Sequence, residues 1–126
     1  MQIEEHEFGQ LMIGDCIVIG EITAGADVEL GVVSQIIDIA NDHFKGEPWG
    51  YISNRINSYS LQPQVHHEAP KFEKNMIAFA VVTSRNNRGQ FVGLEKHIAG
   101  DSYSFAVFVT LEDAITWMKQ ELSKES

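Results

Sequence analysis

The chain has few basic residues, and they are scattered rather than clustered. Nine Lys and Arg stand against 18 Asp and Glu, which gives a formal net charge of −9 over 126 residues. Surfaces that bind nucleic acid or anionic membranes need clustered Lys and Arg. The composition therefore argues against a nucleic-acid partner and against binding to an anionic membrane surface.

Cysteine and long apolar runs are also scarce. The single cysteine, Cys16, excludes an internal disulfide, so a reducing compartment is the natural interpretation. Cys16 stands in the apolar stretch CIVI, and we expect a buried small side chain rather than a reactive thiol. The N-terminus lacks the pattern of a signal peptide, and the longest apolar run, Met76–Val82, is too short to cross a bilayer. We therefore expect a cytoplasmic protein that is not embedded in a membrane.

The motifs of familiar enzymes and metal sites are missing as well. There is no Gly-x-Ser-x-Gly elbow, no Walker loop and no dinucleotide-binding glycine pattern. His66 and His67 are adjacent, but neighbouring residues of a helix or strand point apart, and no third ligand stands at a suitable spacing. We therefore expect no catalytic residue, no metal and no cofactor.

The first part of the chain predicts two strands joined by a tight turn. The first strand is expected over Gln2–Ile13, with a bulge at Gly9, and the second over Cys16–Ile22. Gly14-Asp15 fits a two-residue hairpin turn that needs glycine at its first central position. Such a hairpin makes the first strand antiparallel and places it at an edge of the sheet.

Helices and strands then alternate to the end of a single domain over residues 1–126. The first helix is expected to begin at an Asp27 cap and to end at Lys45 and Gly46. The last helix is expected to follow an N-cap at Thr110, with Asp113 three residues on. Further strands are expected at Pro48–Ser53, Met76–Thr83 and Phe105–Thr110, and further helices after Ser60 and over Arg88–Ile98.

This alternation is typical of an α/β protein with helices on both faces of a mostly parallel sheet. The prediction is a five-stranded mixed sheet, with the first strand antiparallel at the edge, four parallel strands and about four helices. The strand beginning at Phe105 is nearly continuous in apolar or β-branched residues. Such a run is typical of a strand buried on both faces.

The element order, with PWGYISNR at the third strand and the closing FVTLEDAITWM, resembles the SpoIIAA-like proteins. They are a branch of the STAS fold whose small members are also described as Sec14-like. IGEITAG, YISNRINSYSLQP and EDAITWM look like the pattern of bacterial members with no assigned activity. The resemblance covers nearly the whole chain and implies a sheet of one antiparallel and four parallel strands.

The resemblance also implies a position for a phosphorylation switch. In the anti-sigma-factor antagonists of this family, a serine after the third strand is phosphorylated in an Asp-Ser-Gly-like context. The matching residues 53–60 read SNRINSYS, with no Asp-Ser pair and no glycine after it. Ser58 and Ser60 are the candidate phosphorylation sites, and the departure from the family pattern argues against a conserved switch.

All three arginines of the chain follow predicted strands. In sheets of this kind ligands bind outside the carboxyl ends of the strands, where the strand order reverses. A guanidinium group suits a carboxylate or a phosphate, so one interpretation is an anion-binding pocket, and the other is simple pairing with surface acidic residues. The candidate ligand-binding residues are Asn54, Arg55, Asn57, Tyr59, Arg85 and Arg88.

Three classes of function remain open. The first is a non-catalytic regulatory module that binds another protein, for which the acidic charge favours a basic partner surface. The alternative is a Sec14-like module that binds a small anionic ligand or a lipid, and an enzyme built on the three arginines is the least favoured class. A ligand binder should show a deep apolar pocket, and a protein-binding module a flat exposed apolar patch. A homodimer is also expected, because edge strands and apolar helix faces invite pairing.

Overall fold

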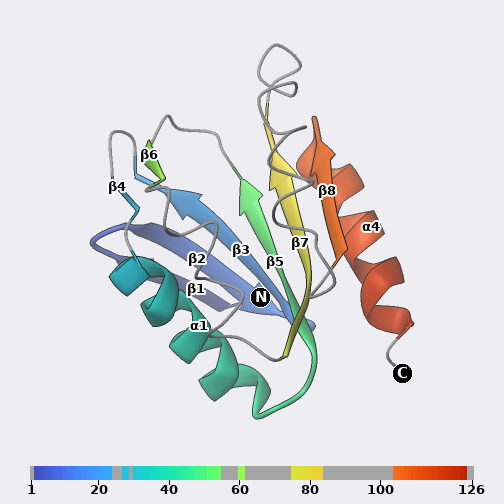
Figure 1. Cartoon of the computed structure of the whole chain (residues 1–126), viewed down its shortest axis with the longest axis horizontal. Coiled ribbons are helices and arrows are strands. Elements are labelled where there is room, and N and C mark those ends of the chain that lie inside the picture. The colour runs from blue at the N-terminus through green and yellow to red at the C-terminus, as the bar shows by residue number, and fades with distance from the viewer. Residues whose placement is uncertain are drawn as a thin grey trace.

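A mixed six-stranded sheet carries one helix on each face in the computed structural model of the chain (Figure 1). The structure describes residues 2–23, 27–28, 30–54, 60–61, 75–83 and 104–124. The elements are β1 (Gln2–His6), β2 (Gly9–Gly14), β3 (Ile17–Ile22), β4 (Asp27–Val28), α1 (Leu30–Phe44), β5 (Trp49–Asn54), β6 (Ser60–Leu61), β7 (Met76–Val82), β8 (Ser104–Phe108) and α4 (Leu111–Ser123). The sheet order is β1-β2-β3-β5-β7-β8, and β4 and β6 form a separate parallel pair.

The N-terminal residues form two strands instead of the one that was predicted over Gln2–Ile13. A turn at Glu7 and Phe8 separates β1 from β2, which pair antiparallel, and β2 pairs antiparallel with β3. Gly9 begins β2 at a φ of 145°, and a Cβ there would overlap the carbonyl oxygen of Glu21. The glycine that was predicted to form a bulge therefore lets β2 start close against β3.

The second turn lies one residue later than predicted. Its two central residues are Asp15 and Cys16, with φ values of 53° and 62°, and Gly14 pairs with Ile17 as the last residues of the two strands. Positive φ at both central positions is the geometry of a type I′ turn, which matches the twist of the flanking strands. Asp tolerates this conformation, so glycine is not required at the first position.

The prediction of an α/β protein with a mixed sheet is confirmed, whereas the prediction of five strands is wrong. The strands β3, β5, β7 and β8 are parallel and follow one another in space in the order of the sequence. The strand β2 is their antiparallel neighbour, and β1 lies at the edge as an additional strand. The sixth strand arises because the turn at Glu7 and Phe8 divides the first predicted strand.

Among the described residues there are two helices, α1 and α4, and not about four as predicted. Ser60 was expected to cap a helix, but it begins β6 and pairs with Asp27. Asp27 is therefore in a strand and does not cap α1, which begins at Leu30. The helix predicted over Arg88–Ile98 lies outside the described residues.

The predicted end of α1 and the predicted start of α4 are confirmed. After Phe44 the chain turns through positive φ at Lys45 and Gly46, as expected of a helix that ends before glycine. Thr110 precedes α4 in an extended conformation, and its hydroxyl oxygen accepts a hydrogen bond of 3.2 Å from the backbone N–H of Asp113.

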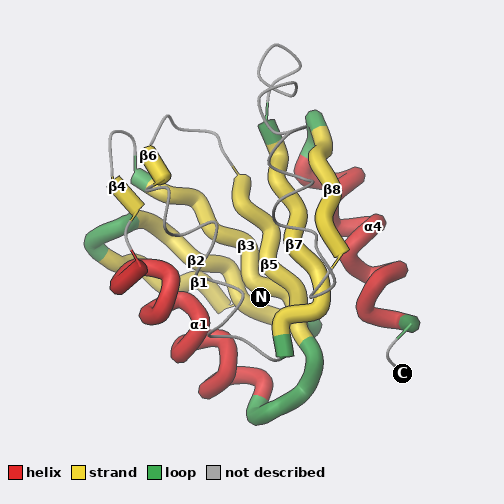
Figure 2. The backbone as a smooth tube through the Cα atoms, in the orientation of Figure 1, coloured by secondary structure: helices red, strands yellow, loops and turns green. Residues whose placement is uncertain are grey.

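The core has two layers, one on each face of the sheet (Figure 2). Ile36, Ile37 and Ala40 of α1 pack against side chains of β2, β3 and β5. Ala114 and Met118 of α4 pack on the other face, against β3, β5 and β7. All residues of β5 are buried because both helices cover this central strand.

The strand β8 is less buried than its apolar sequence predicted. Phe105 is buried, but Ser104 is exposed and the remaining residues are half-buried, because β8 is an edge strand. Aromatic side chains cross three strands at one level, with ring centroids 5.5 Å apart from Tyr51 to Phe79 and again from Phe79 to Phe105. Of the aromatic residues predicted for the core, Trp49 and Phe105 are buried, while Phe79, Phe108 and Trp117 are partly buried and pack against it.

Candidate functional site

Buried polar side chains gather where the central parallel strands end. Ser53 and Asn54 are the last residues of β5, and Thr83 follows β7 directly. Asn54 lies opposite Val82 in the β5–β7 register, so these residues lie at the same edge of the sheet. Among the described residues these three are the buried polar ones. Hydroxyl and amide groups at adjacent strand ends are the kind of polar group that fixes the orientation of a ligand.

The predicted anion site is only partly represented in the structure. Of the candidate ligand-binding residues, Asn54 is described, and it is buried at the end of β5. Ser60 is in β6, and the remaining candidates lie outside the described residues: Arg55, Asn57, Ser58, Tyr59, Arg85 and Arg88. Ser53 and Thr83 were not among the candidates, although each directly adjoins a predicted strand end.

The described parallel strands show no reversal of order, so the described part of the chain does not form the reversal at which the crevice was expected. The order β3-β5-β7-β8 runs in one direction across the sheet. The carboxyl ends of β3 and β5 nevertheless come together at one edge. The short strands β4 and β6, which follow β3 and β5 in the sequence, pair in parallel, as Figure 1 shows beyond the ends of those strands.

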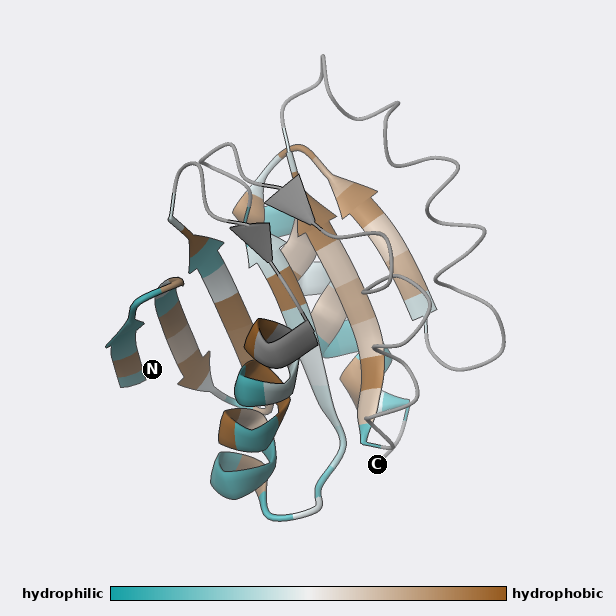
Figure 3. Ribbon diagram, turned by 60° about the vertical axis from the view of Figure 1, so that its left-hand side comes forward, coloured by the Kyte–Doolittle hydropathy of each residue, from teal (hydrophilic) through white to brown (hydrophobic). Residues whose placement is uncertain are grey.

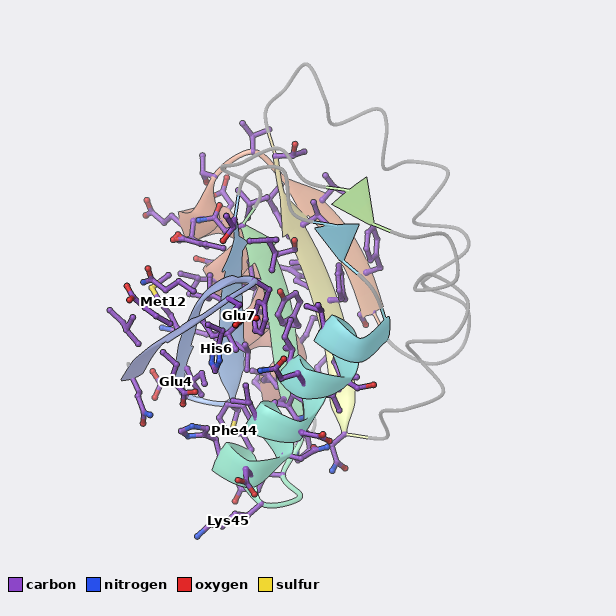
Figure 4. All side chains as sticks on the ribbon, turned by 90° about the vertical axis from the view of Figure 1, so that its left-hand side faces the viewer. Glu4, His6, Glu7, Met12, Phe44 and Lys45 are labelled. Carbon is purple, nitrogen blue, oxygen red and sulfur yellow. The ribbon has the colours of Figure 1, made fainter. Side chains whose placement is uncertain are left out.

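A second cluster, which sequence reasoning missed, joins the edge strand β1 to α1. One carboxylate oxygen of Glu4 accepts a hydrogen bond of 2.9 Å from Nε2 of His43, and the other lies 3.2 Å from Nε2 of His6. The hydrogen bond from His43, with a smaller one from His6, lowers the pKa of Glu4. Figure 4 shows Glu4 and His6 beside the end of α1 at Phe44.

The outer edge of β1 combines an apolar side chain with acidic neighbours. Ile3 is 60% exposed, the most exposed large hydrophobic residue in the described part of the chain. It lies opposite Met12 on the face of the sheet that carries α4, and Glu5 follows on the same face. Figure 3 shows the strand beside the N label as hydrophilic apart from its apolar band.

The net charge of the protein comes entirely from the residues before Lys45. No Lys or Arg occurs in residues 1–44, whereas acidic and basic residues balance after that point. The nine acidic residues of the first part are Glu4, Glu5, Glu7, Asp15, Glu21, Asp27, Glu29, Asp38 and Asp42. Most of these residues lie in or directly beside β1, β2, β3 and α1, whereas Asp27 is in β4 and Glu29 lies outside the described residues.

Cys16 is half-buried on the turn between β2 and β3, not in a buried strand as expected. Its Sγ lies 3.8 Å from Oε2 of Glu47. Burial first, and then the Glu47 carboxylate, raise the pKa of the thiol. A raised pKa lowers the thiolate fraction at neutral pH, so this position does not favour a nucleophile.

Within the described residues, no three His, Cys, Asp or Glu side chains lie in an arrangement that could hold a metal ion. Neither described helix combines the length and the apolar character needed to cross a bilayer. No protein-family model, curated protein or solved structure matches the chain.

Proposed function

We propose that this protein is a non-catalytic cytoplasmic module of the STAS/SpoIIAA-like type that regulates a partner protein by binding it through the β1–β2 end of the sheet. The observation that carries the proposal is the exposed Ile3 at the edge of the acidic part of the molecule. A single exposed apolar residue is common on protein surfaces, but the charge of one sign around Ile3 favours a partner surface of the opposite charge.

The arrangement of the strands supports the family part of this proposal. From β2 to β8 the sheet has one antiparallel and four parallel strands, which is the composition that the sequence resemblance implies. The absence of a matching family model leaves that resemblance a proposal. Phosphorylation of Ser58 or Ser60 and homodimer formation stay predictions of the sequence.

The test compares two charge variants of the tagged protein in its own host, with partners identified by cross-linking and mass spectrometry. Glu5→Lys/Glu7→Lys reverses exposed charges at the β1 end. Glu47→Lys/Glu112→Lys makes the same change of formal charge at exposed positions elsewhere. A partner cross-linked to β1 that is lost only from the first variant supports the proposal. Equal loss from both variants, or cross-links only at other elements, contradicts it.

A small anionic ligand at the carboxyl edge is the second candidate function. The buried Ser53, Asn54 and Thr83 favour it, because they place hydroxyl and amide groups at adjacent strand ends. Native mass spectrometry of protein from its own host should then detect a bound small molecule. Asn54→Leu should lose that mass while Glu112→Lys retains it, and a bare wild-type protein would contradict this function.

A further inference from the structure

The hydrogen-bonding pattern of the first hairpin leaves two residues of β1 with outward backbone groups. The hairpin turns at Glu7 and Phe8, and His6 and Gly9 close it as a directly opposed pair. In a two-residue hairpin the closing pair exchanges both backbone hydrogen bonds, and bonded and non-bonded pairs then alternate along the strands. Gln2, Glu4 and His6 therefore bond to β2, whereas the N–H and C=O groups of Ile3 and Glu5 point away from the sheet.

No described strand pairs with this outer edge of β1. Proteins commonly protect such an edge with proline, with lysine or with a bulge. The sequence of β1, QIEEH, contains no proline and no lysine, and its register with β2 is continuous over all five pairs. The edge therefore has neither proline nor a bulge, no described strand covers it, and its glutamates disfavour an acidic strand but not a basic one.

The charge on the edge opposes pairing with a second copy of the chain and favours a basic segment. An antiparallel second β1 centred on Glu4 would place two Glu4 side chains directly opposite each other, and like charges in that position are destabilising. Contacts with His43 and His6 hold the Glu4 carboxylate in place, and Glu5 and Glu7 are exposed nearby. The lack of any Lys or Arg in residues 1–44 extends the same negative field over the neighbouring elements.

We propose that the outer edge of β1 is a docking site for an extended, Lys- or Arg-rich segment of the partner protein, which adds to the sheet as an antiparallel strand. This inference rests on the proposed function and specifies how the partner binds. The segment carries an apolar residue opposite Ile3 and basic residues opposite Glu4 and Glu5. Main-chain hydrogen bonds to Ile3 and Glu5 give affinity, and the alternating side chains give specificity.

The experiment uses the full chain and a fluorescent synthetic peptide with the core Thr-Lys-Lys-Val-Thr, which has this pattern when antiparallel. Two variants at one position separate backbone from side-chain effects. Glu5→Ala removes only the carboxylate, whereas Glu5→Pro also removes the outward N–H. Proline is tolerated at edge positions whose N–H faces solvent, so the β1–β2 pairing should survive, as circular dichroism and thermal unfolding would verify.

Glu5→Pro should weaken peptide binding by about tenfold relative to Glu5→Ala, since a strand-adding ligand depends on main-chain hydrogen bonds. A peptide N-methylated at its valine has the same side chains, and its affinity for the wild-type chain should fall by a similar factor. This peptide provides the test without any change to the protein. A control peptide with Glu in place of both Lys should not bind.

The contrary outcomes separate the two proposals. Equal peptide affinity for Glu5→Ala and Glu5→Pro, with no effect of N-methylation, would overturn strand addition. Failure of the wild-type chain to bind the peptide at low salt would also overturn strand addition. Neither peptide result bears on the cross-linking experiment, which tests by itself whether a partner protein binds at β1. The proposed function itself would be overturned if the partner cross-linked equally well to the wild type and to Glu5→Lys/Glu7→Lys.

Discussion

The two ends of the sheet differ in charge and in how completely they are covered. The end built from β5, β7, β8 and α4 comes from the part of the chain in which acidic and basic residues balance, and α4 buries its central strands. The end built from β1, β2, β3 and α1 comes from residues 1–44, the part of the chain that accounts for the whole net charge, and leaves Ile3 exposed. In our proposal the second end is the binding surface, with the exposed Ile3 at its edge.

The largest difference between the two ends should appear in the free energy of unfolding. Met118 of α4 is fully buried against β5 and β7, so Met118→Ala should lower this free energy by about 3 kcal/mol. Ile3→Ala should change it by less than about 0.5 kcal/mol, because Ile3 is largely exposed. Urea unfolding followed by circular dichroism measures both values. Similar losses for the two variants would contradict the difference in burial between Met118 and Ile3.

The N-cap of α4 should contribute a smaller amount to the covered end. Thr110→Ala removes the hydrogen bond to the N–H of Asp113 and should lower the free energy of unfolding by about 1 kcal/mol. The matched control is Thr116→Ala, which removes an exposed hydroxyl bonded to the carbonyl of Glu112 within the helix. This control should stay within about 0.5 kcal/mol of the wild type. A larger loss for Thr116→Ala than for Thr110→Ala would show that the cap has been misassigned.

At the acidic end, the β2–β3 turn contains a strained residue. Cys16 has a φ of 62°, and a left-handed conformation costs a residue with a side chain about 1 kcal/mol that glycine avoids. Cys16→Gly and Cys16→Ala both remove the thiol, but only glycine relieves the backbone. Cys16→Gly should therefore unfold at a higher urea concentration than Cys16→Ala. The reverse order would mean that the turn does not adopt positive φ at this position.

The smallest expected effect is the pH dependence of the link between β1 and α1. The hydrogen bond from His43 holds the pKa of Glu4 in the folded protein below its usual value of 4.5. Ionised Glu4 therefore contributes stability above this pH, and the contribution is lost as the pH falls through the folded-state pKa. Glu4→Gln lacks this contribution. The difference in stability between wild type and Glu4→Gln should thus be present near neutral pH and should shrink below about pH 4.5. Parallel stability curves over this range would exclude the contribution.

Features set by neighbouring residues could be predicted from the sequence. The cap at Thr110, the end of α1 at Lys45 and Gly46, and the buried strand from Trp49 were all found, because each depends on a short local pattern. The turn at Asp15 and Cys16 was predicted one residue too early, because Gly14 is a stronger turn signal than Cys16. Asp27 has a good capping side chain, but its pairing with Ser60 prevails over that local preference.

Features that depend on distant contacts could not be predicted in the same way. Asn54 was proposed as a ligand-binding residue only because it follows a recognisable strand, and its role stays a prediction. Glu4 and His43 lie 39 residues apart, and only the packing of α1 against the first hairpin brings them together. The sequence predicted an edge strand that includes Ile3, but it did not predict the turn at Glu7 and Phe8. This turn contains no glycine, and it makes β1 a separate strand.

Hydrogen exchange of the β1 amides, measured by NMR with and without the Thr-Lys-Lys-Val-Thr peptide, tests the central claim most directly. In the free protein the amides of Glu4 and His6 should be protected by β2, whereas those of Ile3 and Glu5 should exchange rapidly. Bound peptide should protect Ile3 and Glu5 and leave the pattern of Glu4 and His6 unchanged. Protection of Ile3 and Glu5 in the free protein, or their continued rapid exchange when peptide is bound, would contradict the account.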